Sequence, residues 1–363
     1  MSRKFFGHQT FKGRGTLSNP AGRFDRTTQE EVDDGWYREE EPESLAQTVM
    51  PDRAKSVIST NDSPDVGFDY SINPYRGCEN GCVYCFARPT HSYLGLSPGL
   101  DFETKLFYKE NAAQLLEQEL SKPKYVPKPI ALGINTDGYQ PLERRLKVTR
   151  SILEVLAKTR HPVSIISKSA LVVRDLDLLA DMARDRLVSV ALSVTTLSAE
   201  TKRALEPRTG SPQARLRAMR MLADAGVPVG VMVAPVIPAI TDHEMESILE
   251  AAAGSGATTA GYVLLRLPYE LKDLFREWLA EHYPDRAGHV MSLIQQARGG
   301  RDNDPNFGSR MRGTGPYAQL LRSRFHLATR KLGLNDARTR HELDATLFRP
   351  PRPATPQLTL GFD

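Results

Sequence analysis

The chain has 363 residues, of which 40% are hydrophobic and 25% are charged, and its formal net charge is +4. These values are typical of a folded globular protein and exclude a disordered or fibrous one, and so small a net charge indicates no particular partner. No apolar run approaches the length of a membrane span, and the first residues lack the apolar core of a signal peptide. The sequence therefore predicts a cytoplasmic protein with no membrane partner.

The N-terminal region, residues 1–65, is rich in Gly, Arg, Asp and Glu and has no apolar periodicity. This composition predicts a largely irregular arm without a core of its own. A basic patch precedes the acidic run of this arm: Lys12, Arg14, Arg23 and Arg26. We interpret the arm as solvated and draped over the domain in preference to a dedicated nucleic-acid arm. The remaining chain divides into an α/β domain (66–298), a Gly/Arg loop with a C-terminal helix (299–347), and a Pro-rich tail with a terminal peptide (348–363).

The chain has three cysteines, all within one C-x-x-x-C-x-x-C stretch: Cys78, Cys82 and Cys85. An odd number of closely spaced cysteines fits disulfides badly and indicates metal or redox chemistry in a reducing compartment. A structural zinc site needs four protein ligands, and the nearest candidate for the fourth is His91. A 4Fe-4S cluster usually takes four cysteines, so three would leave one iron open to an exogenous ligand. Gly77 and Gly81 loosen the backbone enough for the three thiolates to meet.

From residue 69 onward, short apolar or β-branched runs alternate with longer segments of helical period. The predicted strands are 69–73, 130–134, 163–167, 187–194, 229–234 and 260–266. The predicted helices are 109–121, 142–160, 172–185, 211–225 and 242–253. Ser211 before Pro212 predicts a helix start, Gly226 a helix end, and Thr241 with Glu244 a capping box. This alternation predicts a parallel sheet with right-handed crossovers, either doubly wound or rolled into a partial barrel.

Polar segments lie at or near the ends of the later predicted strands: 135–143, 167–169, 193–196, 233–238 and 265–268. A further one, 205–209, follows 193–196 in the chain. Taken singly, each is as consistent with turn or cap chemistry as with a ligand site. In parallel sheets, however, ligand sites lie at the carboxyl ends of the strands. Together these segments predict a ring of polar groups around one mouth.

The cysteine spacing, with the aromatic Tyr84 directly before the last cysteine, resembles the radical S-adenosylmethionine (SAM) signature. The resemblance implies an α/β fold, a partial (β/α)6 TIM-type barrel, with the cysteine loop directly after the first strand. It also implies two cofactors, a 4Fe-4S cluster and SAM, whose amino and carboxylate groups chelate the open iron. In that superfamily the reduced cluster splits SAM to a 5′-deoxyadenosyl radical, which implies an external electron donor.

Five blocks resemble more narrowly the spore photoproduct lyase branch of the superfamily: 73–78, 136–143, 192–197, 205–208 and 231–238. Carried over by position, the resemblance makes Cys78, Cys82 and Cys85 the cluster ligands. It places Tyr84 against the adenine of SAM. Thr136 and Asp137 would face the methionine amino group, and Ser193 and Arg208 would meet the ribose and the carboxylate.

The chain departs from the lyase in one respect. The lyase uses a further cysteine, outside the cluster, to return a hydrogen atom to the substrate radical, and here all three cysteines belong to the motif. The lyase reaction on thymine dimers is therefore not expected unless a tyrosine is the hydrogen donor, for which the candidates are Tyr75, Tyr139 and Tyr269.

Beyond the α/β domain, residues 270–283, 285–297 and 316–332 have helical patterns, and 298–315 form a long Gly/Arg loop. The loop and the last helix are as consistent with a basic, aromatic nucleic-acid surface as with a solvated face. The residues concerned are Arg298, Arg301, Arg310, Arg312, Tyr317, Arg322, Arg324, Phe325, Arg330 and Lys331.

The tail ends in a short peptide, 357–362, behind a Pro-rich linker. It resembles the Gln-Leu-x-Leu-Phe type of peptide by which bacterial repair and replication proteins bind the DNA sliding clamp, with one glycine inserted before the phenylalanine. The resemblance implies that Leu358, Leu360 and Phe362 enter apolar pockets while Gln357 makes hydrogen bonds. The alternative is that these residues add a strand to, or pack on, the protein's own barrel.

The sequence therefore favours a radical SAM enzyme, with a nucleic acid as the candidate substrate. A hypothesis from a different class is a non-catalytic protein that uses a three-cysteine metal site as a structural or redox-sensing staple while it binds nucleic acid.

Overall fold

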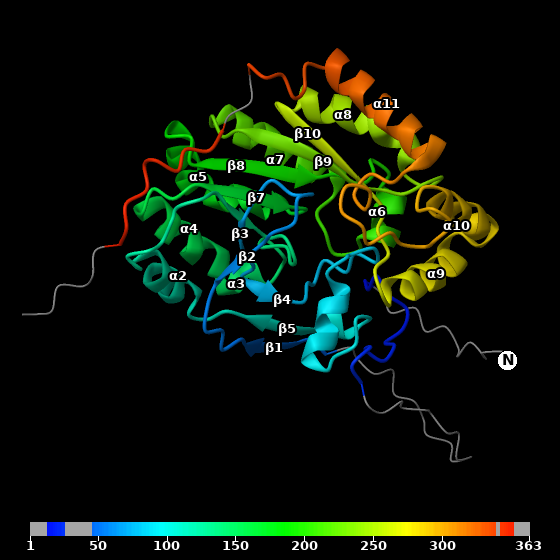
Figure 1. Ribbon diagram of the computed structural model, residues 1–363, viewed down its shortest axis with the longest axis horizontal. Coiled ribbons are helices and arrows are strands. Elements are labelled where there is room, and N and C mark those ends of the chain that lie inside the picture. The colour runs from blue at the N-terminus through cyan, green and yellow to red at the C-terminus, as the bar shows by residue number, and fades with distance from the viewer. Residues whose placement is uncertain (1–12, 26–45, 339–341, 352–363) are drawn as a thin grey trace, which may run out of the picture.

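The centre of the molecule is a seven-stranded sheet, seen in a computed structural model that describes residues 13–25, 46–338 and 342–351 (Figure 1). The strand order is β10-β9-β8-β7-β6-β3-β2; the first six strands are parallel, and β2 is antiparallel to β3. The bounds are β2 Ile58–Thr60, β3 Tyr70–Ile72, β6 Ile130–Leu132, β7 Val163–Ser167, β8 Val188–Ser193, β9 Val229–Val236 and β10 Thr259–Leu264. All six strands predicted from the sequence are present.

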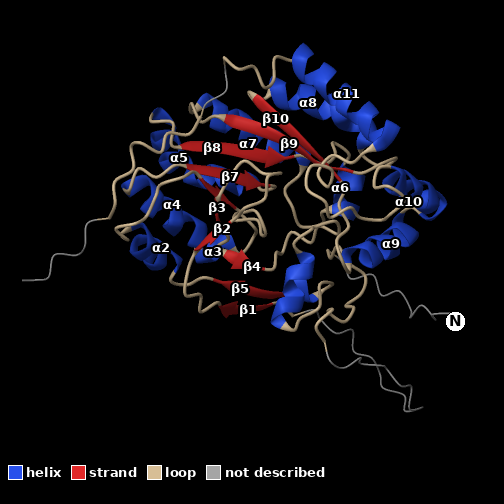
Figure 2. Cartoon of the chain, in the orientation of Figure 1, coloured by secondary structure: helices blue, strands red, loops and turns tan. Residues whose placement is uncertain are grey.

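Helices connect the successive parallel strands, and most of them cover the outer side of the curved sheet (Figure 2). They are α2 Ala112–Leu120, α3 Glu143–Leu146, α4 Val148–Lys158, η2 Ala170–Asp175, α5 Leu176–Arg184, α6 Ala199–Leu205, α7 Pro212–Asp224, η3 Asp242–Glu244 and α8 Met245–Gly254. The predicted fold class, an α/β partial (β/α)6 barrel with N-terminal and C-terminal extensions, is confirmed. The arrowheads of β7 and β8 point toward the loops around α6, so the carboxyl ends of the strands open on that side.

The core forms because apolar side chains recur at the period of each element. On α4, Val148, Ile152 and Val155 are buried along one stripe that faces the sheet. On β7, Val163, Ile165 and Ser167 are buried, while the alternate residues Ser164 and Ile166 are half-buried. Full burial of each such side chain contributes roughly 1.5–3 kcal/mol.

A small second sheet was not predicted. β5 (Lys105–Tyr108) pairs in parallel with β1 (Thr48–Pro51) and antiparallel with β4 (Tyr75–Arg76). Strands this short do not show a period in the sequence. The short helices η1 (Arg88–Leu94) and α1 (Asp101–Thr104) precede β5. The second sheet fixes the start of the cysteine loop, because β4 lies directly before Gly77 and Cys78.

Two helix predictions need correction. The segment 142–160 forms two helices, because Lys147 between them has the left-handed φ of +54°. The capping box at Thr241 and Glu244 is wrong. The Thr241 hydroxyl instead accepts a hydrogen bond from the N–H of Ile237 (2.9 Å), and the Glu244 carboxylate accepts one from the N–H of Leu197 (2.6 Å).

The start of α7 agrees with its prediction. The Ser211 side chain accepts a hydrogen bond from the N–H of Ala214 (3.2 Å), and Pro212 is the first helical residue. Gly226, two residues beyond the helix, has a φ of +79°, which is the conformation expected of a glycine stop.

Beyond β10 the chain forms α9 (Leu271–His282), η4 (Pro284–Arg286), α10 (Ala287–Gln296) and α11 (Gly315–Lys331), in agreement with the predicted helices. α9 and α10 share an apolar cluster with Val83 and Tyr84 of the cysteine loop. α11 lies beside α8 at the edge of the molecule (Figure 1). Among the described residues, no helix is both long and apolar enough to cross a membrane.

Candidate active site

The three cysteines lie in one loop, at the carboxyl end of the first parallel strand. The N–H of Cys78 donates to the carbonyl of Phe102 (2.9 Å), which anchors the start of the loop. Gly77 and Gly81 have φ angles of +76° and +66°, which glycine adopts without strain. Cys78 and Cys82 are buried, and Cys85 is half-buried.

The surroundings of the thiols favour a positively charged centre between them. Burial raises the pKa of Cys78 well above its ordinary value, with Asp137 and the other two cysteines adding to the rise. Burial likewise raises the pKa of Cys82 to about 12, with a further contribution from Glu206. Buried thiols of this kind ionise readily only beside a compensating cation such as iron. The donor set therefore fits an iron-sulfur cluster.

Within the residues that it describes, the structure does not add a fourth protein ligand for the zinc interpretation. Among residues 13–25, 46–338 and 342–351, no group of three or more His, Cys, Asp or Glu side chains converges on a single metal ion. Thiolates that each bind a different iron of a cluster do not need to converge in this way. His91, the candidate fourth zinc ligand, is buried; its Nε2 lies 2.9 Å from the carbonyl oxygen of Lys105, and its ring packs edge-on against Phe102.

Thr136 and Asp137 follow β6 and fasten the cysteine loop. The Asp137 carboxylate accepts four hydrogen bonds, from the side chains of Asn80 (2.9 Å) and Ser167 (2.7 Å) and from the backbone N–H groups of Lys168 (2.8 Å) and Tyr139 (2.9 Å). The Thr136 hydroxyl donates to the carbonyl of Gly77 (3.0 Å). Both residues lie beside the loop, but these contacts are within the protein, so their predicted contact with the SAM amino group stays a prediction.

Tyr84 belongs to a buried network that the sequence did not predict. Its hydroxyl donates to the carboxylate of Glu206, which also accepts from the Thr195 hydroxyl (2.6 Å) and from the Arg215 guanidinium. Glu206 is 0% exposed and Arg215 is 1% exposed. Burial acts to raise the pKa of Glu206, but the charges of Arg215 and Lys168 and the hydrogen bonds of the network outweigh it and lower that pKa to about 2. The network fixes Tyr84, whose predicted place against the adenine stays a prediction.

Ser193 and Arg208, the predicted contacts of the ribose and the carboxylate, lie at different depths. Ser193 ends β8 and is 3% exposed, and its carbonyl accepts a hydrogen bond from Arg215 (2.8 Å). Arg208 is exposed at the surface, and its guanidinium donates to Glu79 (3.2 Å) in the cysteine loop. Both residues border the site, and their contacts with SAM stay predictions. Glu206 lies in the same sequence block as Arg208, directly after α6, and its membership of that block was the one available signal for it.

The family model of the Radical SAM superfamily matches residues 72–252, the stretch that holds the cysteine loop and most of the barrel. The chain belongs to the radical SAM superfamily. It is therefore an enzyme of this superfamily. The family uses a 4Fe-4S cluster and SAM, so the two predicted cofactors are confirmed.

This radical SAM protein has relatives in bacteria and archaea. It is 40% identical to Uncharacterized protein Rv2578c of Mycobacterium tuberculosis over 231 residues. The aligned stretch covers 63% of this chain and 68% of the relative. It is 29% identical to Uncharacterized protein MJ0683 of Methanocaldococcus jannaschii over 237 residues. That alignment covers 65% of this chain and 84% of the relative.

Solved structures of spore photoproduct lyase have the same fold. The lyase complexed with dinucleoside spore photoproduct aligns with a TM-score of 0.57 at 16% identity, over 79% of this chain and 80% of that chain. A double mutant of the lyase with bound AdoMet and dinucleoside spore photoproduct aligns equally well. At 16% identity, this structural similarity concerns the fold alone.

The three tyrosines predicted as hydrogen donors have different surroundings. Tyr75 and Tyr139 are buried at 1% and 0% exposure, and the Tyr75 hydroxyl donates to the carboxylate of Glu143. Burial raises the pKa of both tyrosines, Glu143 adding to the rise at Tyr75 and Asp175 at Tyr139. This arrangement argues against contact of either one with a substrate. Tyr269, in the loop after β10, is 64% exposed and stays a prediction.

The Gly/Arg loop is in part a structural element of the radical SAM domain. Arg298 is 3% exposed and donates to four carbonyl oxygens, those of Leu264, Leu265, Ser309 and Arg310. Arg310 binds the Asp65 carboxylate (2.5 Å), and Phe325 is 5% exposed with its ring centroid 4.8 Å from that of Tyr262. The suggestion that Arg298 and Phe325 face nucleic acid is therefore wrong. A nucleic-acid surface stays a prediction for the exposed basic residues, which are Arg301, Arg312, Arg322, Arg330 and Lys331.

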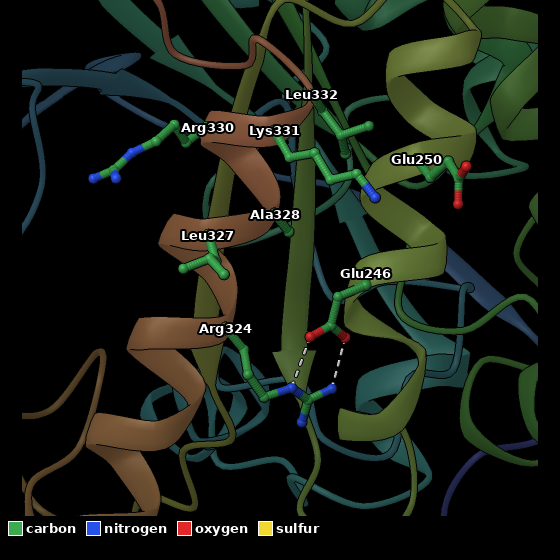
Figure 3. A pocket seen from close by; sticks show the side chains of 8 residues that line it. All are labelled: Glu246, Glu250, Arg324, Leu327, Ala328, Arg330, Lys331 and Leu332. Carbon is green, nitrogen blue, oxygen red and sulfur yellow. Dashed lines mark hydrogen bonds and ion pairs between the residues drawn. The ribbon is translucent and has the colours of Figure 1, made fainter.

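A shallow pocket between α8 and α11 is separate from the active site (Figure 3). Arg324 binds Glu246 across it (2.6 Å), and Lys331 extends toward Glu250. Its other lining residues are Leu327, Ala328, Arg330 and Leu332. All of them come from the two helices and none from a strand-end loop. The predicted clamp peptide, with Gln357, Leu358, Leu360 and Phe362, lies outside the described residues.

Proposed function

We propose that this radical SAM enzyme reductively cleaves SAM and abstracts a hydrogen atom from a nucleic-acid substrate. When bound, the cluster and SAM supply the chemistry: one electron from an external donor cleaves SAM to methionine and a 5′-deoxyadenosyl radical, which takes a hydrogen atom from the substrate. The three cysteines at the mouth of the barrel carry the first part of the proposal. Because thiols must stay reduced to bind iron, we also propose a reducing, cytoplasmic location.

The chain's own residues hold and shield the reacting groups. Asp137 and Thr136 fasten the cysteine loop to the end of β6. Glu206 and Arg215 fix the Tyr84 side chain within a buried network. Tyr84 also belongs to the apolar cluster with α9 and α10, which excludes water from that side of the loop.

Two exposed aromatic residues at the mouth support the substrate class. Phe86 directly follows the last cysteine and is 43% exposed, and the Arg266 guanidinium lies 5.7 Å from its ring centroid. Tyr269 follows β10, and the Arg23 guanidinium lies 4.2 Å from its ring centroid. Flat rings beside guanidinium groups bind bases by stacking and phosphates by charge. A structure of similar fold, the lyase double mutant, contains a dinucleoside spore photoproduct.

The return of a hydrogen atom distinguishes this enzyme from the lyase. All three cysteines of the sequence are in the cluster motif, so a cysteine donor is not available. Tyr269 is the proposed donor, since it is the exposed member of the three predicted tyrosines. Without a hydrogen atom from Tyr269, repair of thymine dimers is expected to be little or none.

The first test is anaerobic reconstitution, followed by iron and sulfide analysis and EPR spectra of the reduced protein with and without SAM. We expect a 4Fe-4S cluster whose spectrum changes with SAM, and formation of 5′-deoxyadenosine. Changing Cys78, Cys82 or Cys85 to Ala should abolish cluster binding. A spectrum that does not respond to SAM, together with nucleic-acid binding, would favour the non-catalytic alternative.

The second test concerns the substrate. Single-stranded DNA and RNA of mixed sequence are added to the reduced enzyme with SAM, and binding and 5′-deoxyadenosine are measured. Tyr269→Ala should weaken binding by about 1–3 kcal/mol, the usual contribution of one stacked base. Tyr269→Phe, the matched control, keeps the ring and should bind like the parent while losing hydrogen return. Equal binding by all three proteins would refute a stacking role for Tyr269.

A further inference from the structure

An N-terminal segment, residues 14–23, lies across the cysteine loop and connects it to α9; we call it the strap. In Figure 1 it is the dark blue segment near α9. At its far end, Arg23 binds Glu270 directly before α9 (3.1 Å), and in its middle the Ser18 hydroxyl donates to Glu277 of α9 (2.5 Å). In its middle, Asn19 exchanges two hydrogen bonds with Asp101, at 3.0 and 3.1 Å. The strap therefore links α1 to α9.

The near end of the strap is fastened to one buried carboxylate, that of Glu103. The backbone N–H groups of Gly15 (3.1 Å) and Thr16 (3.2 Å) and the Thr16 hydroxyl (3.2 Å) all donate to it. Arg88, three residues after the last cysteine, donates to the same carboxylate at 2.5 Å. Glu103 and Arg88 are 0% exposed, and Thr16 is 1% exposed. A buried, charge-assisted cluster of this kind is costly to open at any one member.

Arg88 connects the Glu103 carboxylate to the backbone of the cysteine loop. Its Nε donates to the carbonyl of Cys82 (2.9 Å), and its Nη1 donates to the carbonyl of Gly99 (3.0 Å). The carboxylate that holds the strap therefore also holds the residue that orients the backbone of a cluster ligand.

The strap also touches the loop directly. A Cβ at position 15 would lie 1.6 Å from the carbonyl oxygen of Gly81, and a Cβ at position 81 would lie 2.9 Å from Glu103 Oε2. Three segments thus meet at the Gly81 turn, between Cys78 and Cys82, with no room for a side chain at Gly15 or Gly81. Such close backbone contact requires glycine at both positions.

We infer that the strap is part of the cluster site: it fixes the Gly81 turn so that the three thiolates keep the spacing that a 4Fe-4S cluster needs, and Glu103 is its positioning residue. The strap residues do not contact the reacting atoms and act through the loop. The inference rests on the binding of a cluster by the three cysteines, and not on the substrate proposed above.

The first experiment uses the full chain with Gly15→Ala, and Gly67→Ala as the matched control, because nothing lies within 4 Å of a Cβ at position 67. After anaerobic reconstitution, the release of iron to a ferrous chelator and the SAM-induced change in the EPR spectrum are measured. Gly15→Ala should release iron about 5–30-fold faster than the parent, the factor that corresponds to a loss of 1–2 kcal/mol in holding the loop closed. Gly67→Ala should match the parent.

A second pair of variants avoids any added bulk. Thr16→Val has nearly the same shape but loses the hydroxyl that donates to Glu103, and should release iron on the order of 10-fold faster. Thr16→Ser restores the hydroxyl and should return the release rate to that of the parent, while the unfolding temperature separates loop opening from global unfolding.

Iron release at the parent rate in Gly15→Ala, with an unchanged response to SAM, would overturn the inference. So would equal release by Thr16→Val and Thr16→Ser. A parent protein that binds no cluster at all would overturn both the cluster assignment and the inference about the strap. Failure of the strap inference alone is distinguishable, because the parent would then still bind a cluster.

Discussion

Replacing Glu206 by Gln tests the buried network around Tyr84. The fall in the pKa of Glu206 from its ordinary 4.5 to about 2 corresponds to about 3 kcal/mol of stability at neutral pH. An independent comparison agrees, since removing one charge of a buried ion pair typically costs about 3–5 kcal/mol. We therefore expect Glu206→Gln to lower the free energy of unfolding at pH 7 by about 3 kcal/mol, because Arg215 is left as an uncompensated buried cation.

The free energy that Glu206 contributes to folding should depend on pH. Because the folded-state pKa is depressed, the stabilisation is present above the unfolded pKa of 4.5 and is lost as the pH falls toward 2. The difference between parent and Glu206→Gln should therefore shrink over that interval. Urea unfolding followed by circular dichroism at pH 7, 4.5 and 3 measures it. The matched control is Glu246→Gln, which breaks a more exposed pair with Arg324 and should cost less than about 1 kcal/mol.

Two outcomes would refute this account of the network. One is a loss below about 1 kcal/mol for Glu206→Gln at pH 7, which would make the pair no stronger than a surface salt bridge. The other is a difference between parent and variant that does not change between pH 7 and pH 3.

Three further predictions concern residues with other roles. Tyr75→Phe removes a donor to Glu143 and should lower the free energy of unfolding by about 1–3 kcal/mol without changing the yield of the substrate-derived product; loss of that product with an unchanged free energy of unfolding would restore Tyr75 as a hydrogen donor. Asp137→Ala should lower the iron content after reconstitution, whereas Asp137→Asn keeps an acceptor oxygen and should retain more; full iron in both would favour a role toward SAM alone. A labelled peptide of residues 352–363 should bind a purified bacterial sliding clamp with roughly micromolar affinity, and a version with Gln357 and Phe362 changed to Ala should not; equal binding would remove the clamp proposal.

The sequence predicted those parts of the fold whose signal is local or periodic. Six strands and most helices follow from repeating apolar residues, since each must bury one face. The three cluster cysteines lie within eight residues of one another, so their spacing alone reveals them. The helix start at Ser211 was also correct, because the cap and its partner are three positions apart.

The remaining features depend on contacts that only the folded chain creates. Arg88 and Glu103 are 15 positions apart, and Arg215 and Glu206 are nine apart, with no periodic pattern that links them. Charged residues are rarely buried, so sequence reasoning places them at the surface by default. Glu244 failed as part of a capping box for a related reason, because its carboxylate bonds Thr196 in the β8–α6 connection, 48 positions away.

The backbone of Tyr269 has a φ of +52°, a left-handed conformation that costs roughly 1–2 kcal/mol for a residue with a side chain. The Arg23 guanidinium over its ring offsets about 0.5–1 kcal/mol of that cost at this exposed position. Glycine at 269 would relieve the first contribution, remove the second and add roughly 0.5–1 kcal/mol of backbone entropy lost on folding, so the three changes nearly cancel. Tyr269→Gly should consequently be almost silent in thermal unfolding, and any change that it causes in substrate binding or turnover reports on the aromatic ring and not on a weakened fold.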